Sequence, residues 1–188
     1  MNFELLVKEA MVTCWNKQEY KRIRYMLSIY GLDKLKEELD LGDNALSLII
    51  SGEHVNRCTE SIRSNDFTLI EPTDTIGNKH RLLCPNPSIL KSLFGLNTWT
   101  VSNVLTFDVS GDSTQYIKLL DEMESIATQY TVDYNWSKNI ALYFHCYPFN
   151  SVNTLHLHIV DLNDVNPRFY SKSTINLPLK SIRSVLCR

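Results

Sequence analysis

Hydrophobic residues recur every three or four positions through roughly the first forty residues, which predicts helices there. Further along, short segments rich in β-branched and aromatic residues are bounded by proline, glycine or polar turn residues, which predicts strands. These segments are residues 67–70, 80–84, 99–109, 140–146 and 155–162. Helical spacing returns from Thr114 to Tyr130, which predicts one long amphipathic helix before the last two strands.

The order of these elements predicts the fold class. Helices come first, an antiparallel sheet follows, and one helix is inserted before the last two strands, which is an α+β layout. We therefore expect a helical N-terminal extension at residues 1–43 and a main domain with packed helices at residues 44–188. A short helix is also predicted near the end of the chain, at residues 177–185.

Composition narrows the range of partners. The 188 residues carry a formal net charge of −2, which gives no reason to expect long nucleic acid or an anionic membrane as a ligand. The longest apolar runs are too short to span a bilayer, and the first residues lack the pattern of a secretion signal. The five cysteines are odd in number and form no CxxC pair, so we expect reduced thiols and an intracellular protein, cytoplasmic or nuclear.

The richest chemistry lies in the last predicted strand. Thr154, His156 and His158 alternate with apolar residues, so they project from one face of a strand whose other face joins the core. Imidazole suits nucleophilic work near neutral pH because a useful fraction of it is unprotonated. A zinc site built from His145, Cys146 and the two strand histidines is an alternative, since these residue types are zinc ligands.

Residues 150–160 read N-S-V-N-T-L-H-L-H-I-V, which resembles the histidine-triad (HIT) signature His-φ-His-φ-His-φ-φ, where φ is apolar. The match has no gap, with Thr154 in the place of the first histidine and Asn150 where glutamine is usual. Upstream segments resemble the family in the same order. They are residues 49–53, 67–72 and 77–96, so that the resemblance covers about residues 45–162. The flank 143–148 also resembles the scavenger mRNA-cap hydrolase branch of the family.

The resemblance implies a fold and a reaction. The fold would be a HIT-like antiparallel sheet, and the reaction would be attack by His156 on an α-phosphorus to form a nucleotidyl-histidine that water hydrolyses. Residues implied in holding phosphate or ribose are His158, Ser151, His145, Asn150, Thr154 and Glu71. The implied substrate is a small nucleotide or cap-like molecule, and no metal or other cofactor is needed. The family commonly forms dimers, and whether this chain pairs stays open.

Two departures from the family pattern leave a second interpretation open. Thr154 replaces a histidine, and Asn86 stands where lysine is common. The alternative to an enzyme is therefore a catalytically inactive nucleotide-binding or protein-interaction module on the same fold.

Overall fold

The computed structural model describes residues 58–72, 76–86, 88–89, 92, 114–145, 155–172 and 176–186. The strands are β1 (Cys58–Arg63), β2 (Phe67–Pro72), β3 (His80–Pro85), β4 (Ile140–His145), β5 (Leu157–Asp161) and β6 (Asn176–Pro178). The longer helices are α5 (Thr114–Asp133), α6 (Pro167–Lys172) and α7 (Leu179–Leu186). None of the described helices combines the length and the apolar character that a bilayer crossing requires.

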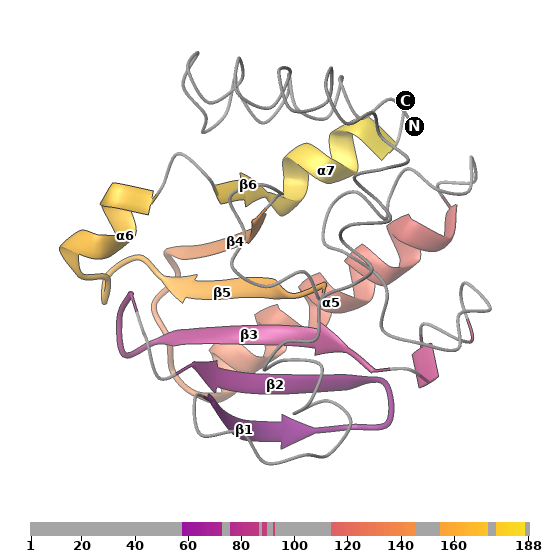
Figure 1. Cartoon of the computed structure of the whole chain (residues 1–188), viewed down its shortest axis with the longest axis horizontal. Coiled ribbons are helices and arrows are strands. Elements are labelled where there is room, and N and C mark those ends of the chain that lie inside the picture. Colours follow the sequence, from indigo (N-terminus) through magenta and orange to yellow (C-terminus); the bar gives the residue numbers. More distant parts are fainter. Residues whose placement is uncertain are drawn as a thin grey trace, which may run out of the picture.

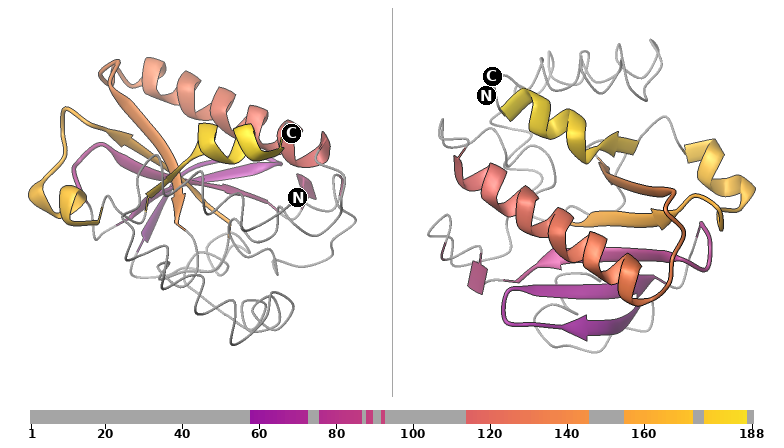
Figure 2. Two further views of the ribbon diagram at one scale, coloured as in Figure 1. Left: turned by 90° about the horizontal axis from the view of Figure 1, so that it is seen from above. Right: turned by 180° about the vertical axis from the view of Figure 1, so that it is seen from behind.

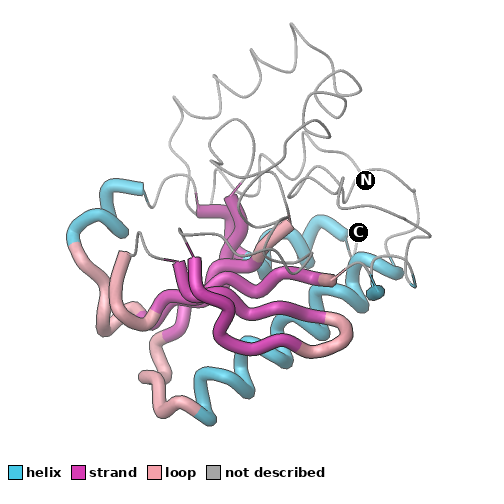
Figure 3. Tube along the Cα trace, turned by 60° about the horizontal axis from the view of Figure 1, so that its bottom comes forward, coloured by secondary structure: helices cyan, strands magenta, loops and turns pink. Residues whose placement is uncertain are grey.

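The six strands form one sheet in the order β1-β2-β3-β5-β4-β6, and every neighbouring pair is antiparallel (Figure 1). β5 is therefore an internal strand with a neighbour on each side. All five of its residues are buried, as expected for a strand covered on both faces. Figure 3 shows the strands as one continuous layer with helices beside it. The residues of β5 are thus held by β3 and β4 together.

Helix α5 packs through a single stripe of side chains. Its buried residues recur at helical spacing and are Tyr116, Leu119, Leu120, Met123, Ala127, Tyr130 and Thr131. The helix ends at Asp133, and Asn135 has a φ of 53°, the left-handed conformation that commonly follows a helix end. The backbone N–H of Trp136 donates to the carbonyl of Thr131 at 2.8 Å, which satisfies one of the last carbonyls.

Alternation along the strands assigns α5 to one face of the sheet. Leu69 of β2 is opposite Leu83 of β3, so the two side chains share a face. Both line a cavity of about 350 Å³ together with Ile126 and Tyr130 of α5. We call the face that carries Leu69 and Leu83 the helix face. Helix α7 lies on the same side of the sheet as α5 (Figure 2).

The opposite face carries an apolar cluster next to α6. Ile76, Tyr143, Val160 and Phe169 are buried together, and Phe169 comes from α6. Tyr143 and Val160 belong to adjacent strands of the sheet. This cluster covers one end of the face and leaves the rest of it to other residues of β3, β4 and β5.

Asp161, the last residue of β5, connects three segments. Its carboxylate accepts hydrogen bonds from the backbone N–H groups of Ser137 at 2.7 Å and Asn163 at 3.0 Å. The Nζ atom of Lys79 lies 3.4 Å away. Burial raises the pKa of this carboxyl, but the hydrogen bonds from Ser137, Asn163 and Lys79 outweigh it and lower the pKa on balance. A buried charge with these partners fastens the end of β5 to the turn before β4.

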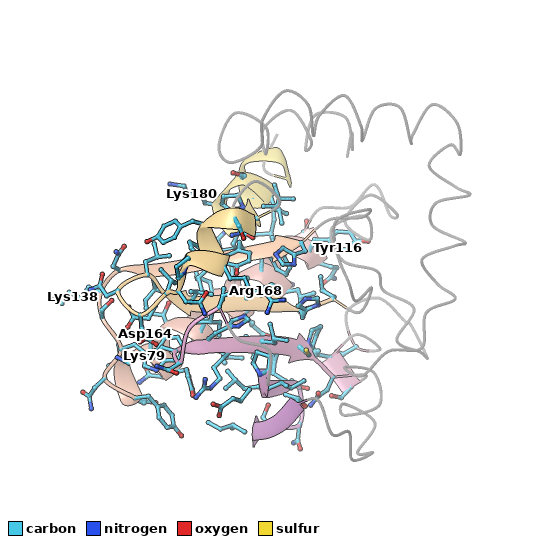
Figure 4. The ribbon with its side chains drawn as sticks, turned by 60° about the vertical axis from the view of Figure 1, so that its left-hand side comes forward. Lys79, Tyr116, Lys138, Asp164, Arg168 and Lys180 are labelled. Atoms are coloured by element: carbon cyan, nitrogen blue, oxygen red, sulfur yellow. The ribbon has the colours of Figure 1, made fainter. Side chains whose placement is uncertain are left out.

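The segment before β3 is fastened to the segment after β5. Gly77 forms a β-bridge with Val165, and a Cβ atom on Gly77 would lie 2.2 Å from the carbonyl oxygen of Asp164. The backbone N–H of Lys79 donates to the carboxylate of Asp164 at 2.7 Å, and the two residues lie side by side in Figure 4. Only glycine allows the two backbones to approach this closely.

The expected α+β class is confirmed, with an antiparallel sheet and packed helices. The strands predicted at residues 67–70, 80–84, 140–146 and 155–162 correspond to β2, β3, β4 and β5, and the predicted long helix is α5. Residues 99–109 and the N-terminal extension lie outside the described residues. β1, β6 and α6 were not predicted, because each is short and none has a clear period in its sequence.

Candidate active site

Strand register brings four histidines to one face of the sheet. His158 of β5 is opposite Leu82 of β3 and Tyr143 of β4. His80 lies two residues from Leu82, and His145 lies two residues from Tyr143, so both point to the same side as His158. A fourth histidine immediately precedes β5 at the position two before His158. We call the four residues the histidine cluster: His80, His145, His156 and His158.

His158 is at the centre of the histidine cluster. Its ring centroid is 4.8 Å from that of His156 and 4.3 Å from that of His145. The ring of Tyr143 is stacked against it at 4.7 Å, with 9° between the planes. His156 and His158 are 4% and 7% exposed. The structure therefore places the two strand histidines side by side, as their alternation predicts, and sets them in a buried group of rings.

His80 and His158 are joined by a hydrogen bond between ring nitrogens. Nε2 of His80 lies 3.0 Å from Nδ1 of His158. Burial, and after it the nearby His145, His156 and Arg81, lower the pKa of His80 to about 3, so its ring is neutral at neutral pH. One proton is then shared between the two facing nitrogens, and the tautomer of His80 decides which nitrogen carries it.

The outer nitrogens of the two rings give two equivalent arrangements. Nδ1 of His80 and Nε2 of His158 are both buried without a hydrogen-bond partner among the described residues. If His80 donates from Nε2, a neutral His158 carries its own proton on Nε2. If His158 donates from Nδ1, the proton of His80 is on Nδ1 instead. Only the first arrangement makes Nε2 of His158 a hydrogen-bond donor.

His145 is held from the next strand. Its Nε2 atom lies 3.0 Å from Oδ1 of Asn176, the first residue of β6. The two residues are paired in the ladder between β4 and β6. Both Asn176 and Tyr143 also line a cavity of about 460 Å³ at this edge of the sheet. Sequence reasoning missed Asn176, because nothing in a three-residue strand far along the chain marks it as a neighbour of His145.

His80 was also missed, although a signal for it exists. It alternates with Leu82 on a predicted strand, in a segment that resembles the HIT pattern. The sequence does not show which strand pairs with this one. The pairing of β3 with β5 is what turns an isolated histidine into a neighbour of His158.

Glu71 does not join the histidine cluster. Its carboxylate makes an ion pair with Arg81 at 3.3 Å. Arg81 in turn donates to the hydroxyl of Tyr130 of α5 at 3.1 Å, and Tyr130 packs on the helix face. Glu71 therefore lies on the helix face, because it is two residues along β2 from Leu69. The ribose contact that the resemblance implies for Glu71 stays a prediction.

Asn86 stands where the family often has lysine, and its side chain makes hydrogen bonds that hold the fold. Its Oδ1 accepts from the hydroxyl of Thr68 at 2.7 Å, and its Nδ2 donates to the carbonyls of Ser64 at 2.8 Å and Asn65 at 3.3 Å. The side chain is buried. Asn86 thus ties the turn between β1 and β2 to the end of β3.

The remaining site residues expected from the sequence are Asn150, Ser151, Thr154 and Cys146, and they lie outside the described residues. Within the described part of the chain, no group of three or more histidine, cysteine, aspartate or glutamate side chains could hold a metal ion. In particular, His80 and His158 direct ring nitrogens at each other.

Comparisons with known proteins add the following. No protein-family model matches the chain, and no curated protein matches it. The chain is similar to the solved structure of a HIT family hydrolase from Clostridium thermocellum, with a TM-score of 0.49 and 18% identity, covering 68% of this chain and 96% of that one. It is also similar to the aprataxin ortholog Hnt3 from Schizosaccharomyces pombe, with a TM-score of 0.41 and 17% identity, covering 69% of this chain and 62% of that one. TM-scores below 0.5 and identities below 20% carry no argument about function. The function of the site is therefore inferred from the residues of this chain.

Proposed function

We propose that the chain is a histidine-triad-type nucleotide hydrolase or transferase. The bond cleaved is a phosphoanhydride or a related bond in a dinucleoside polyphosphate, a cap-like nucleotide or a nucleoside phosphoramidate. One observation carries the proposal. His156 and His158 lie side by side in a buried cluster, and His80 orients the ring of His158.

His156 supplies the nucleophile. A lone pair on its imidazole attacks the α-phosphorus, the N–P bond forms, and the bond from phosphorus to the leaving group breaks. The leaving group takes the electron pair and then a proton. Water next attacks the nucleotidyl-histidine, the N–P bond breaks, and a nucleoside monophosphate leaves. Covalent catalysis of this kind replaces one difficult step by two easier ones.

His158 stabilises the charge on the phosphate. The proposal takes the arrangement in which His80 donates to Nδ1 of His158, so that the Nε2 proton of His158 can be donated to a non-bridging oxygen as negative charge shifts there. Ser151, Asn150 and Thr154 remain proposed contacts of the same phosphate. Imidazole and hydrogen-bond donors supply this chemistry, so the proposal contains no metal or other cofactor.

A second candidate is a catalytically inactive nucleotide-binding or interaction module on the same fold. The hydrogen bonds of Asn86 favour it, because they show that this position serves the β1–β2 turn and brings no cation to the phosphates. Thr154 favours it as well, since it leaves the triad with two of its three histidines.

The two candidates are separated by a substrate panel. Purified protein is incubated with dinucleoside polyphosphates, cap analogues and nucleoside phosphoramidates, alongside His156→Asn and the exposed-site control Lys138→Ala. We expect turnover of at least one compound by the wild type and by the control, and none by His156→Asn. Binding without turnover by the wild type would favour the inactive module, and equal turnover by His156→Asn would exclude the mechanism.

A further inference from the structure

Asn176 and His145 form a hydrogen-bonded pair, and only His145 lies within the segment that resembles the HIT family. His145 is in β4, whereas Asn176 is in β6, after the segment that resembles the HIT family. Oδ1 of an asparagine can only accept a hydrogen bond, so the 3.0 Å contact requires that Nε2 of His145 carries a proton and donates it. A neutral His145 is then unprotonated at Nδ1.

This tautomer has a chemical consequence. A ring that already donates from Nε2 becomes a cation by taking a proton on Nδ1, and it keeps the bond to Asn176 in both states. Its orientation therefore does not change when its charge changes.

We propose that Asn176 is a positioning residue of the active site, which fixes the Nε2–H tautomer of His145 and so provides a site for a proton that is taken up when a polyphosphate binds. The proposal rests on the proposed function for the identity of the ligand. The anion is the phosphate chain of a dinucleotide, whose negative charge favours the cationic ring.

The described groups around His145 are consistent with this role. The ring of Tyr143 lies 5.5 Å away, and that of His158 lies 4.3 Å away. The other two members of the histidine cluster are on the same face. None of these rings brings a negative charge to His145.

The first test needs no substrate. The chain has five histidines, so ¹⁵N-histidine labelling gives few ring signals, which His→Gln variants assign. In the wild type we expect His145 to be protonated on Nε2 above its pKa. Asn176→Leu should abolish that preference, and Asn176→Asp should raise the pKa of His145 by about one unit or more, because a carboxylate favours the cation. Asn139→Asp adds the same charge at an exposed position just before β4, at the end of the strand away from His145, and should leave His145 unchanged.

The second test measures binding of diadenosine triphosphate with methylene groups in place of the bridging oxygens, between pH 5.5 and 8. If the ligand raises the pKa of His145 by about one unit, affinity should increase about tenfold as pH falls through this range. The midpoint of that change should move to higher pH in Asn176→Asp and be lost in Asn176→Leu.

The outcomes separate the two proposals. A proton on Nδ1 of neutral His145, or the same tautomer in wild type and Asn176→Leu, would overturn the role of Asn176 whatever the substrate. A pH-independent affinity in the wild type would also overturn it. If no dinucleotide binds at any pH, the proposed function fails, and the ring signals alone decide the role of Asn176.

Discussion

Nε2 of His80 and Nδ1 of His158 lie 3.0 Å apart, in rings whose planes differ by only 10°. The bond joins β3 to β5 and is made between two buried side chains. In the proposed mechanism the bond is directed from His80 to His158. The residue that resembles the third histidine of the triad is therefore oriented by a residue well outside the triad.

Replacing His80 should lower turnover without removing the nucleophile. His80→Phe keeps a flat ring but cannot donate, so His158 is free to adopt the other tautomer. We expect kcat to fall roughly 10–100-fold, as for other hydrogen-bonding partners that orient a functional histidine. His80→Gln retains an N–H donor and should recover part of the loss. Steady-state kinetics of the two variants make the comparison, and equal kcat values for both would show that the donor is unimportant.

The covalent intermediate should be detectable on His156. Rapid quenching of a reaction with a radiolabelled dinucleotide should leave label on the protein, located by peptide mapping to residues 155–162. His156→Ala should carry none, and its kcat should be lower by about 10⁴-fold or more, because it lacks the nucleophile. Label that persists in His156→Ala would place the attack on another residue.

The lowered pKa of Asp161 predicts how the free energy of unfolding changes in acid. This pKa is lower in the folded chain than its ordinary value of 3.8, so the ionised carboxylate stabilises the fold. That contribution is complete above the unfolded pKa and is lost as pH falls through the lower, folded pKa. Asp161→Asn should lose about 2–3 kcal/mol of unfolding free energy at pH 7, and the difference from wild type should shrink below about pH 4. Urea unfolding at pH 7, 5 and 3 measures it.

Arg183 provides a contrast for that experiment. Its ion pairs with Asp121 and Glu124 join α7 to α5, but all three side chains are partly exposed. Arg183→Gln should therefore cost no more than about 1 kcal/mol. A loss as large as that of Asp161→Asn would mean that burial is not what makes Asp161 important.

Gly77→Ala tests the contact between the segments that flank β3 and β5. The added methyl group would lie 2.2 Å from a backbone oxygen, which cannot move without shifting the bridge to Val165. We expect a loss of about 1–3 kcal/mol in unfolding free energy, typical of overpacking. Asn78→Ala, at the neighbouring exposed position, is the control and should change stability little. Thermal unfolding of the two variants makes the comparison.

Much of the fold could be predicted because its signals are local. The period-2 alternation at residues 155–162 and the helical stripe from Tyr116 to Tyr130 each depend on neighbours in sequence. β4 lies beside β5, in keeping with the rule that two strands that follow each other in sequence are usually neighbours.

The rest depends on contacts between residues far apart in the chain. The order of strands beside β5, with β3 on its other side, cannot be predicted from either strand alone. Glu71 illustrates the problem. The sequence alone does not show that its side chain is on the helix face and not beside the histidine cluster, because a shift of one residue along a strand reverses the face. Asn176 was missed for the same reason, since its partner is on another strand.

The strand order also affects how the chain reaches its active form. β4 and β5 follow each other in sequence, so three of the clustered histidines can meet early. His80 arrives only when β3 pairs with β5, a contact that closes a loop containing α5 and β4. Such high contact order slows folding. A chain in which β3 has not yet paired with β5 therefore has the proposed nucleophile but lacks the neighbour that orients His158.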